Sequence, residues 1–145
     1  MTRAVQSYKN HRRYFVLYHM VGMPILLANL VIASLHAVRH SSPFNWWFVV
    51  LSVGLIAMAV ASRASTLIVQ NRLIGLEMRL RLATSLPPEL RSRIPELRMR
   101  QLIALRFAGD AELPQLVGRV LDGSLTAPDA IKREIKEWRA DYLRA

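Results

Sequence analysis

Four histidines are the residues of this chain best suited to hold a cofactor or a metal ion, namely His11, His19, His36 and His40. The sequence contains no cysteine, which excludes disulfides, thiolate metal sites, iron–sulfur clusters and cysteine nucleophiles. All ten acidic residues lie at Glu77 or later, so the histidines fall in a part of the sequence that has no carboxylate. One chemistry open to them is axial ligation of a haem or a chlorophyll-type pigment.

His19 and His36 are the candidates for such a site, because both lie in or beside an apolar segment. A single haem cannot use both, since about 25 Å of helix would separate them. The alternative is that each is a neutral imidazole that makes a hydrogen bond at an interface, and we favour this alternative. We therefore predict no cofactor and no metal, and we keep His19 and His36 as the candidate ligands.

A long, nearly uncharged segment surrounds these histidines. Residues 14–62 carry a single formal charge, Arg39, which separates two apolar runs. About 20 helical residues cross the ~30 Å hydrocarbon core of a bilayer, so each run is long enough to span a membrane. The first run has 25 residues, whereas the apolar core of a signal peptide has only ~7–15. We predict a transmembrane hairpin with its two spans at residues 14–38 and 45–62.

Basic residues on both sides of the hairpin predict its orientation. The tail, residues 1–13, carries four Lys/Arg, whereas the loop between the spans carries only Arg39. The positive-inside rule then places both termini in the cytoplasm of a bacterial cell, with the hairpin in the inner membrane. Four arginines are predicted to contact anionic lipid headgroups: Arg12, Arg13, Arg63 and Arg72. The net charge of +10 lies mostly in the first 85 residues, which argues against a nucleic-acid partner.

Small and polar residues form one stripe on each predicted span. The stripe of the first span covers an arc of about 100° on a helical wheel and contains His19, Gly22, Asn29, Ala33 and His36. The stripe of the second span contains Gly54, Ala57, Ala61 and Ala64. Small residues let helices approach closely, and an Asn can hydrogen-bond between helices. We predict that the two stripes pack together, with Asn29 as interhelical glue, and that Pro24 kinks the first span.

The second span is predicted to continue as a helical stalk over residues 63–85, because no proline interrupts it. An apolar stripe in this stalk has a heptad-like spacing and consists of Val69, Leu73, Leu76, Leu80 and Ala83. A neighbouring flank contains Ile74, Met78 and Leu82. Charged residues between them indicate that the stalk is in water, so the stripe must be buried against the C-terminal domain or against a second copy. Both partners, the C-terminal domain and a second copy, are compatible with the sequence.

Prolines after Leu86 end the stalk and begin a predicted cytoplasmic helical domain, residues 86–145. Residues 88–95 leave room for one short turn or helix, and the next predicted helix, 99–107, directs Leu102 and Leu105 inward. Asp110 is the predicted N-cap of a helix that stops at Gly123. That helix buries a stripe of Leu113, Leu116, Val117, Val120 and Leu121.

The last predicted helix starts in residues 126–129, which resemble a capping box with an early proline. It is expected to bury Ile131, Ile135, Trp138 and Tyr142. The predicted fold is therefore all-α: a two-helix transmembrane hairpin, a second helix extended into a cytoplasmic stalk, and a small α-helical bundle.

Several stretches of the sequence resemble a family of short, uncharacterised bacterial membrane proteins, catalogued only as a domain of unknown function. The matching stretches are residues 6–11, 18–19, 79–83, 101–108, 110–114, 130–132 and 138–144. The resemblance extends over nearly the whole chain and implies a two-span architecture with a cytoplasmic helical tail. It implies no activity, and no catalytic residue can be carried over from it.

We find no catalytic constellation in the sequence and predict that the protein is not an enzyme. The leading hypothesis is a membrane accessory or scaffold subunit. Its hairpin would pack against a larger membrane complex, such as a bioenergetic complex, or against a second copy. The alternative is a small homo-oligomeric channel or transporter, with the polar face of the first span lining the conduit. A membrane enzyme that acts on a lipid ranks last.

Overall fold

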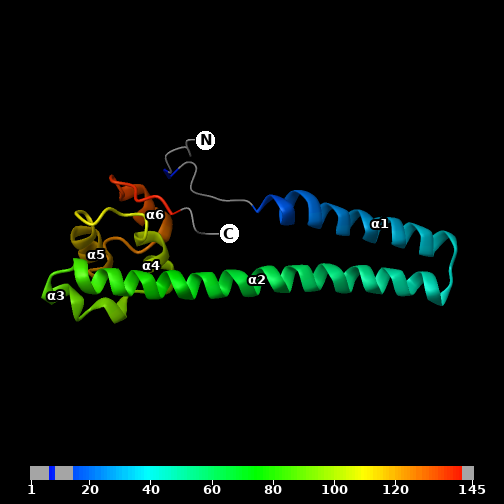
Figure 1. Ribbon diagram of the computed structural model, residues 1–145, viewed down its shortest axis with the longest axis horizontal. Coiled ribbons are helices and arrows are strands. Elements are labelled where there is room, and N and C mark those ends of the chain that lie inside the picture. Colours follow the sequence, from blue (N-terminus) through cyan, green and yellow to red (C-terminus); the bar gives the residue numbers. More distant parts are fainter. Residues whose placement is uncertain (1–6, 9–14, 142–145) are drawn as a thin grey trace. The chain divides into compact units, whose positions relative to one another are not determined.

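The computed structural model describes residues 7–8 and 15–141, and this part of the chain is helical and has no strand. The elements are the π-helix η1 (Leu17–Gly22), α1 (Met23–Arg39), α2 (Pro43–Ser85), α3 (Pro88–Arg91), the 3-10 helix η2 (Ile94–Glu96), α4 (Met99–Leu105), α5 (Leu113–Leu121) and α6 (Pro128–Glu134) (Figure 1). The all-α fold class is thus confirmed. The chain divides into two compact units within α2, between Leu67 and Ile68.

The first unit contains η1, α1 and the beginning of α2, and Figure 1 shows α1 running back alongside α2. Two helices here are long and apolar enough to cross a membrane, Leu17–Arg39 and Pro43–Ser85. Only 6% of the most apolar window of each is buried, and large side chains such as Ile32 point outward. The apolar surface of this unit therefore faces its surroundings and not an interior.

The turn between α1 and α2 follows from local chemistry. Ser42 precedes Pro43, whose fixed φ and missing N–H suit the first position of a helix. The Ser42 hydroxyl accepts a hydrogen bond from the backbone N–H of Asn45 at 3.2 Å, as an N-cap does. The side chain of Asn45 in turn donates to the carbonyl of His40. The turn covers residues 40–42, which fall within the loop predicted between the two spans.

Pro24 affects the helix that precedes it. The sequence predicts a kink, and the structure has a π-helical segment, Leu17–Gly22, directly before α1. The N–H of Met23 bonds to the carbonyl of Tyr18, five residues earlier. A proline ring collides with the carbonyl of residue i−4 and supplies no N–H, and the wider π-turn relieves this conflict.

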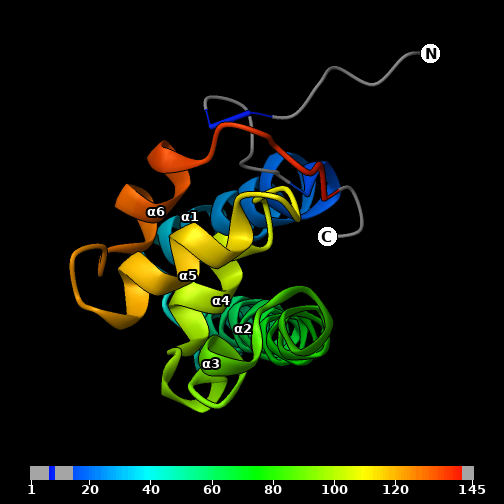
Figure 2. The ribbon, with the colours of Figure 1, turned by 90° about the vertical axis from the view of Figure 1, so that its left-hand side faces the viewer.

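The second unit is built around the C-terminal part of α2. Three side chains in this part of the helix, Ile74, Met78 and Leu82, are nearly inaccessible to solvent, and so is Leu86 directly after its end. They share one core with apolar residues from α4, α5 and α6, among them Leu102, Leu105, Leu113, Val117 and Ile131. Figure 2 views α2 end-on and shows α4, α5 and α6 on one side of it. The inward positions predicted for α4 and α5 are confirmed.

The heptad stripe of the stalk lies outside this core. Val69, Leu73, Leu76 and Leu80 are 54–65% exposed, whereas Ile74, Met78 and Leu82 on the neighbouring flank are at most 8% exposed. The flank, which the sequence analysis describes as neighbouring the stripe, lies on the opposite side of the helix, because the mean positions of the two sets differ by about half a turn at 100° per residue. The domain is therefore attached through the flank, and the stripe remains open.

The last predicted helix is shorter than the sequence suggests. α6 ends at Glu134, although Ile135 is still buried. The chain leaves the helix because the Glu112 carboxylate accepts hydrogen bonds from the N–H groups of Lys136 and Glu137. The N–H of Arg139 then donates to the carbonyl of Phe107 at 2.7 Å, beside an isolated β-bridge of Ala108 and Trp138. Tyr142, which the sequence assigns to this core, lies outside the described residues.

Two predicted caps are also wrong. α5 begins at Leu113 with Glu112 as the N-cap residue, and Asp110 pairs with Arg81 instead. α6 begins at Pro128 after Ala127, which has no side chain that can cap. The predicted stop of α5 is confirmed, because Gly123 has a φ of 83°, in the left-handed region that glycine adopts most readily.

Candidate functional site

The hairpin is joined by a hydrogen bond between polar side chains of α1 and α2. The Asn29 amide donates to the hydroxyl oxygen of Ser52 at 2.7 Å, and the Ser52 hydroxyl donates to the carbonyl of Phe48 at 2.7 Å. Ser52 is 1% exposed and Ala37 is 0% exposed, so these residues mark where the helices touch. The sequence predicts that Asn29 makes a hydrogen bond between helices and does not line a pore, and this contact is such a bond.

The small residues of α2 do not face α1. Gly22 and Ala33 are half-buried, whereas Gly54, Ala57 and Ala61 are exposed. A Cβ added to Gly54 would meet nothing within 4 Å. Ser52 faces α1, and Gly54 lies two residues farther on, about 200° around the helix. The pairing of two small-residue stripes expected from the sequence is thus replaced by contact through Ser52, which leaves Gly54, Ala57 and Ala61 on an outward face.

The candidate histidines are not brought together. His19 lies in the π-helix, where its Nδ1 donates a hydrogen bond to the carbonyl of Phe15 at 3.0 Å. His36, at the other end of α1, has its ring centroid 4.9 Å from that of His40. Within residues 7–8 and 15–141, His, Cys, Asp and Glu form no group of three or more that could hold a metal ion. The contact between His36 and His40 is one that their i, i+4 spacing in the sequence could have indicated.

The four arginines assigned to lipid headgroups fall in different settings. Arg63 is half-buried and Arg72 is exposed, both on α2. Arg12 and Arg13 lie outside the described residues.

A guanidinium that sequence reasoning did not single out fastens α2 to the helical domain. Arg81 donates to the Asp110 carboxylate and to the Ala108 carbonyl, each at 2.7 Å, and to the Arg106 carbonyl at 3.3 Å. Its side chain is 14% exposed. The rigid fork of an arginine suits this task, since it satisfies three acceptors of one loop at once.

A second arginine, Arg106, is buried and contacts the last described residue. Arg106 donates to Asp141 at 2.9 Å and to the Ile103 carbonyl at 2.7 Å, and its guanidinium lies 4.0 Å from the centroid of the Phe107 ring. Phe107 in turn contacts Trp138, with centroids 4.8 Å apart. Arg106 therefore contributes to structure, and it is not part of an exposed basic surface.

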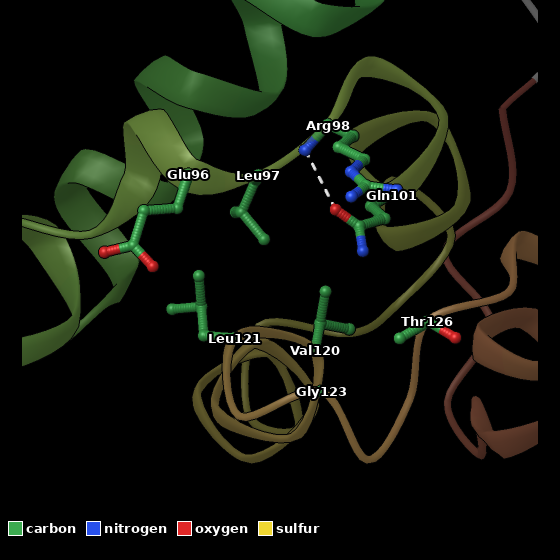
Figure 3. A pocket seen from close by; sticks show the side chains of 8 residues that line it. All are labelled: Glu96, Leu97, Arg98, Gln101, Val120, Leu121, Gly123 and Thr126. Atoms are coloured by element: carbon green, nitrogen blue, oxygen red, sulfur yellow. Dashed lines mark hydrogen bonds between the residues drawn. The ribbon is translucent and has the colours of Figure 1, made fainter.

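A shallow pocket of about 220 Å³ lies between the start of α4 and the end of α5. Its apolar residues are Leu97, Val120 and Leu121, whose side chains project into one space in Figure 3. On its rim, the Gln101 amide oxygen accepts a hydrogen bond from the N–H of Arg98 at 2.8 Å. No pattern in the sequence indicates this pocket, because it forms only when the Gly123 turn brings two separate segments together.

Charge at the rim of the pocket is already compensated. Arg93 donates to both carboxylate oxygens of Glu96, at 3.0 and 2.8 Å. This hydrogen bond lowers the pKa of Glu96, so the carboxylate is ionised at neutral pH and is a poor general base or acid. The apolar residues that line the pocket provide a surface that can bind a small apolar group.

We expect Arg81→Leu to destabilise the helical domain by about 1–3 kcal/mol, because two backbone carbonyls lose their buried donor. Asp110→Asn should cost less, since this carboxylate is 62% exposed and its ion pair is screened by water. Arg79→Leu, on the exposed face of the same helix, is the matched control and should change stability by less than about 0.5 kcal/mol. Urea unfolding monitored by circular dichroism in detergent measures all three. Equal losses for the variants at Arg81 and Arg79 would contradict the assignment.

Comparison with known proteins places the chain in one family. A family model described as "Family of unknown function (DUF6526)" matches residues 1–145. Neither a curated protein nor a solved structure matches the chain.

Proposed function

This chain belongs to the family of unknown function DUF6526, and we propose that it is a non-enzymatic integral membrane scaffold. In this proposal the hairpin crosses the inner membrane of a bacterium and holds the helical domain at its cytoplasmic face. The observation that carries the proposal is the outward apolar surface of α1 and of the first half of α2.

The energetic argument starts from the exposed side chains. Large apolar residues such as Ile25, Ile32 and Val50 are at least 60% exposed along both helices. Each apolar side chain left in water forgoes about 1.5–3 kcal/mol of transfer free energy, and a soluble monomer rarely exposes so large an apolar surface. A lipid bilayer, or another protein within it, covers this surface without any change in the hairpin.

The charges support the proposed orientation. Arg39 is the only formal charge near the loop, whereas Arg63 and Arg72 follow the second span and Arg12 and Arg13 precede the first. Arginines near the ends of a span reach the headgroup region with their long stems. We therefore assign both termini to the cytoplasm and anionic lipids to these four arginines.

The hairpin contact favours a scaffold over the alternative of a channel. Asn29 is the polar side chain nearest the middle of the first span, and its amide donates to Ser52 within the same hairpin. A group engaged in this way serves packing, whereas a conduit needs polar groups that face the passing species. The outward faces, including Gly54 and Ala57, are then available to other integral membrane proteins of a larger complex.

The absence of cysteine from the sequence allows a direct test of topology. In intact cells, an impermeant maleimide should label a Ser41→Cys variant, because Ser41 lies in the exposed turn before α2. An Ala111→Cys variant, exposed in the helical domain, should be labelled only after the cells are opened. Both should remain in the membrane fraction after carbonate extraction. Release of the protein by carbonate, or labelling of Ala111→Cys in intact cells, would contradict the proposal.

The scaffold role is tested by native mass spectrometry in mild detergent. We expect the full chain, purified from its own cells at its natural level, to carry another integral membrane protein in a fixed stoichiometry. A matched preparation in liposomes should show no ion flux above that of empty vesicles. A chain that carries no other protein, or one that conducts in liposomes, would count against a scaffold, and the second result would support the channel.

A further inference from the structure

The stalk of α2 carries an apolar seam that no described part of the second unit covers. The exposed fractions are 65% for Val69, 55% for Leu73, 54% for Leu76 and 63% for Leu80. All helices of the C-terminal domain that contact α2 use the other side, where Ile74, Met78 and Leu82 are buried (Figure 2). We call residues 69, 73, 76, 80 and 83 the stalk seam.

The spacing of the stalk seam is that of a coiled coil. Successive members are separated by four, three, four and three residues, so Leu73 and Leu80 occupy a positions and Val69, Leu76 and Ala83 occupy d positions. In this register the buried Ile74, Met78 and Leu82 fall at b, f and c, on the outer side of a coiled coil. The domain therefore packs where it does not obstruct a partner helix.

The charges beside the stalk seam are complementary to those of a second copy of the same helix. Arg72 occupies a g position and Glu77 the following e position, five residues later. In a parallel, in-register pair, each g side chain meets the e side chain five positions ahead on the partner helix, so Arg72 meets Glu77 of the other copy twice. Glu77 is the first acidic residue of the sequence. Among the described residues, neither Arg72 nor Glu77 has an ion pair of its own.

The same charges disfavour the antiparallel arrangement. In an antiparallel pair, g positions lie next to g positions of the partner, which would bring Arg72 close to Arg72 or Arg79 of the other copy. Two copies with the proposed membrane topology also run in the same direction at this point. The seam is thus matched to a second copy of the same helix in parallel.

We infer that residues 69–83 form a parallel, two-stranded coiled coil with the same residues of a second copy of this chain, held in register by Arg72 and Glu77. The pairing joins two helical domains side by side through their stalks. It names one partner of the proposed scaffold, but its spacing and charges do not depend on what surrounds the first half of α2.

Disulfide trapping of the full chain in membranes tests the seam. Under mild copper–phenanthroline oxidation, a Leu76→Cys variant should form a covalent dimer at least fivefold more efficiently than an Ile68→Cys variant. Ile68 is the matched control, since it is 60% exposed and lies about 100° away from the seam on the same helix. Equal trapping at both positions would overturn the inference. A covalent trimer, formed by chains that carry a second cysteine in the stalk seam, would also overturn it. The same holds for disulfides that form only between Val69→Cys and Ala83→Cys chains, as an antiparallel pair would give.

Charge reversal tests the register separately from folding. Glu77→Arg should lower trapping through Leu76→Cys about tenfold, and adding Arg72→Glu should restore it, because the pair is then inverted. Glu89→Arg is the control, since it makes the same charge change on α3. Loss without rescue, or an equal loss in the control, would contradict the pairing. If carbonate releases a chain that is still trapped through Leu76→Cys, the membrane proposal fails and the coiled coil stands.

Discussion

Continuity of α2 is the constraint on which the other features depend. One helix of 43 residues, Pro43–Ser85, runs without an internal proline and contributes residues to both compact units. Its first half presents Ser52 to α1 and large apolar side chains to the surroundings. Its last turns present Ile74, Met78 and Leu82 to the helical domain.

The contacts at the end of α2 explain how a small domain is held to it. Apolar burial through Leu82 and Leu86 supplies the non-directional part of the attachment. Arg81 adds direction, because its fork fits only one placement of the loop that carries Ala108 and Asp110. The domain has few residues and short helices, and such a unit gains from an external helix in its core. The stalk is therefore part of the domain's fold and not merely its tether.

Sequence periodicity was sufficient to predict a helix and its buried side where that helix has a single apolar face. The stripe of α5 and the glycine after it define that helix, because Leu113, Val117 and Gly123 each have a single role that their residue type specifies. The long apolar runs likewise indicate α1 and α2. In the stalk, two apolar flanks lie on one helix, and nothing local decides which of them the domain covers.

The remaining differences arise from interactions between residues distant in the sequence. Asp110 has the residue type of an N-cap, but Arg81, 29 positions earlier, engages its carboxylate. The last helix stops where the Glu112 carboxylate, 24 positions earlier, accepts the N–H of Lys136. The outward position of Gly54 follows from the hydrogen bond that Asn29 donates to Ser52, which turns Ser52 toward α1. The pocket beside Gln101 requires two segments to meet, which no local pattern encodes.

We propose that the first half of α2 spans a membrane, and its last turns form part of the core of the helical domain. A spin-label accessibility scan over positions 44–86 in lipid nanodiscs tests it most directly, with each label placed on the cysteine-free chain. The account predicts high oxygen and low aqueous-reagent collision in the first half. In the last turns of the helix it predicts low aqueous-reagent collision at Ile74, Met78 and Leu82, which the helical domain covers. High aqueous access across the first half, or at Ile74, Met78 and Leu82, would contradict it.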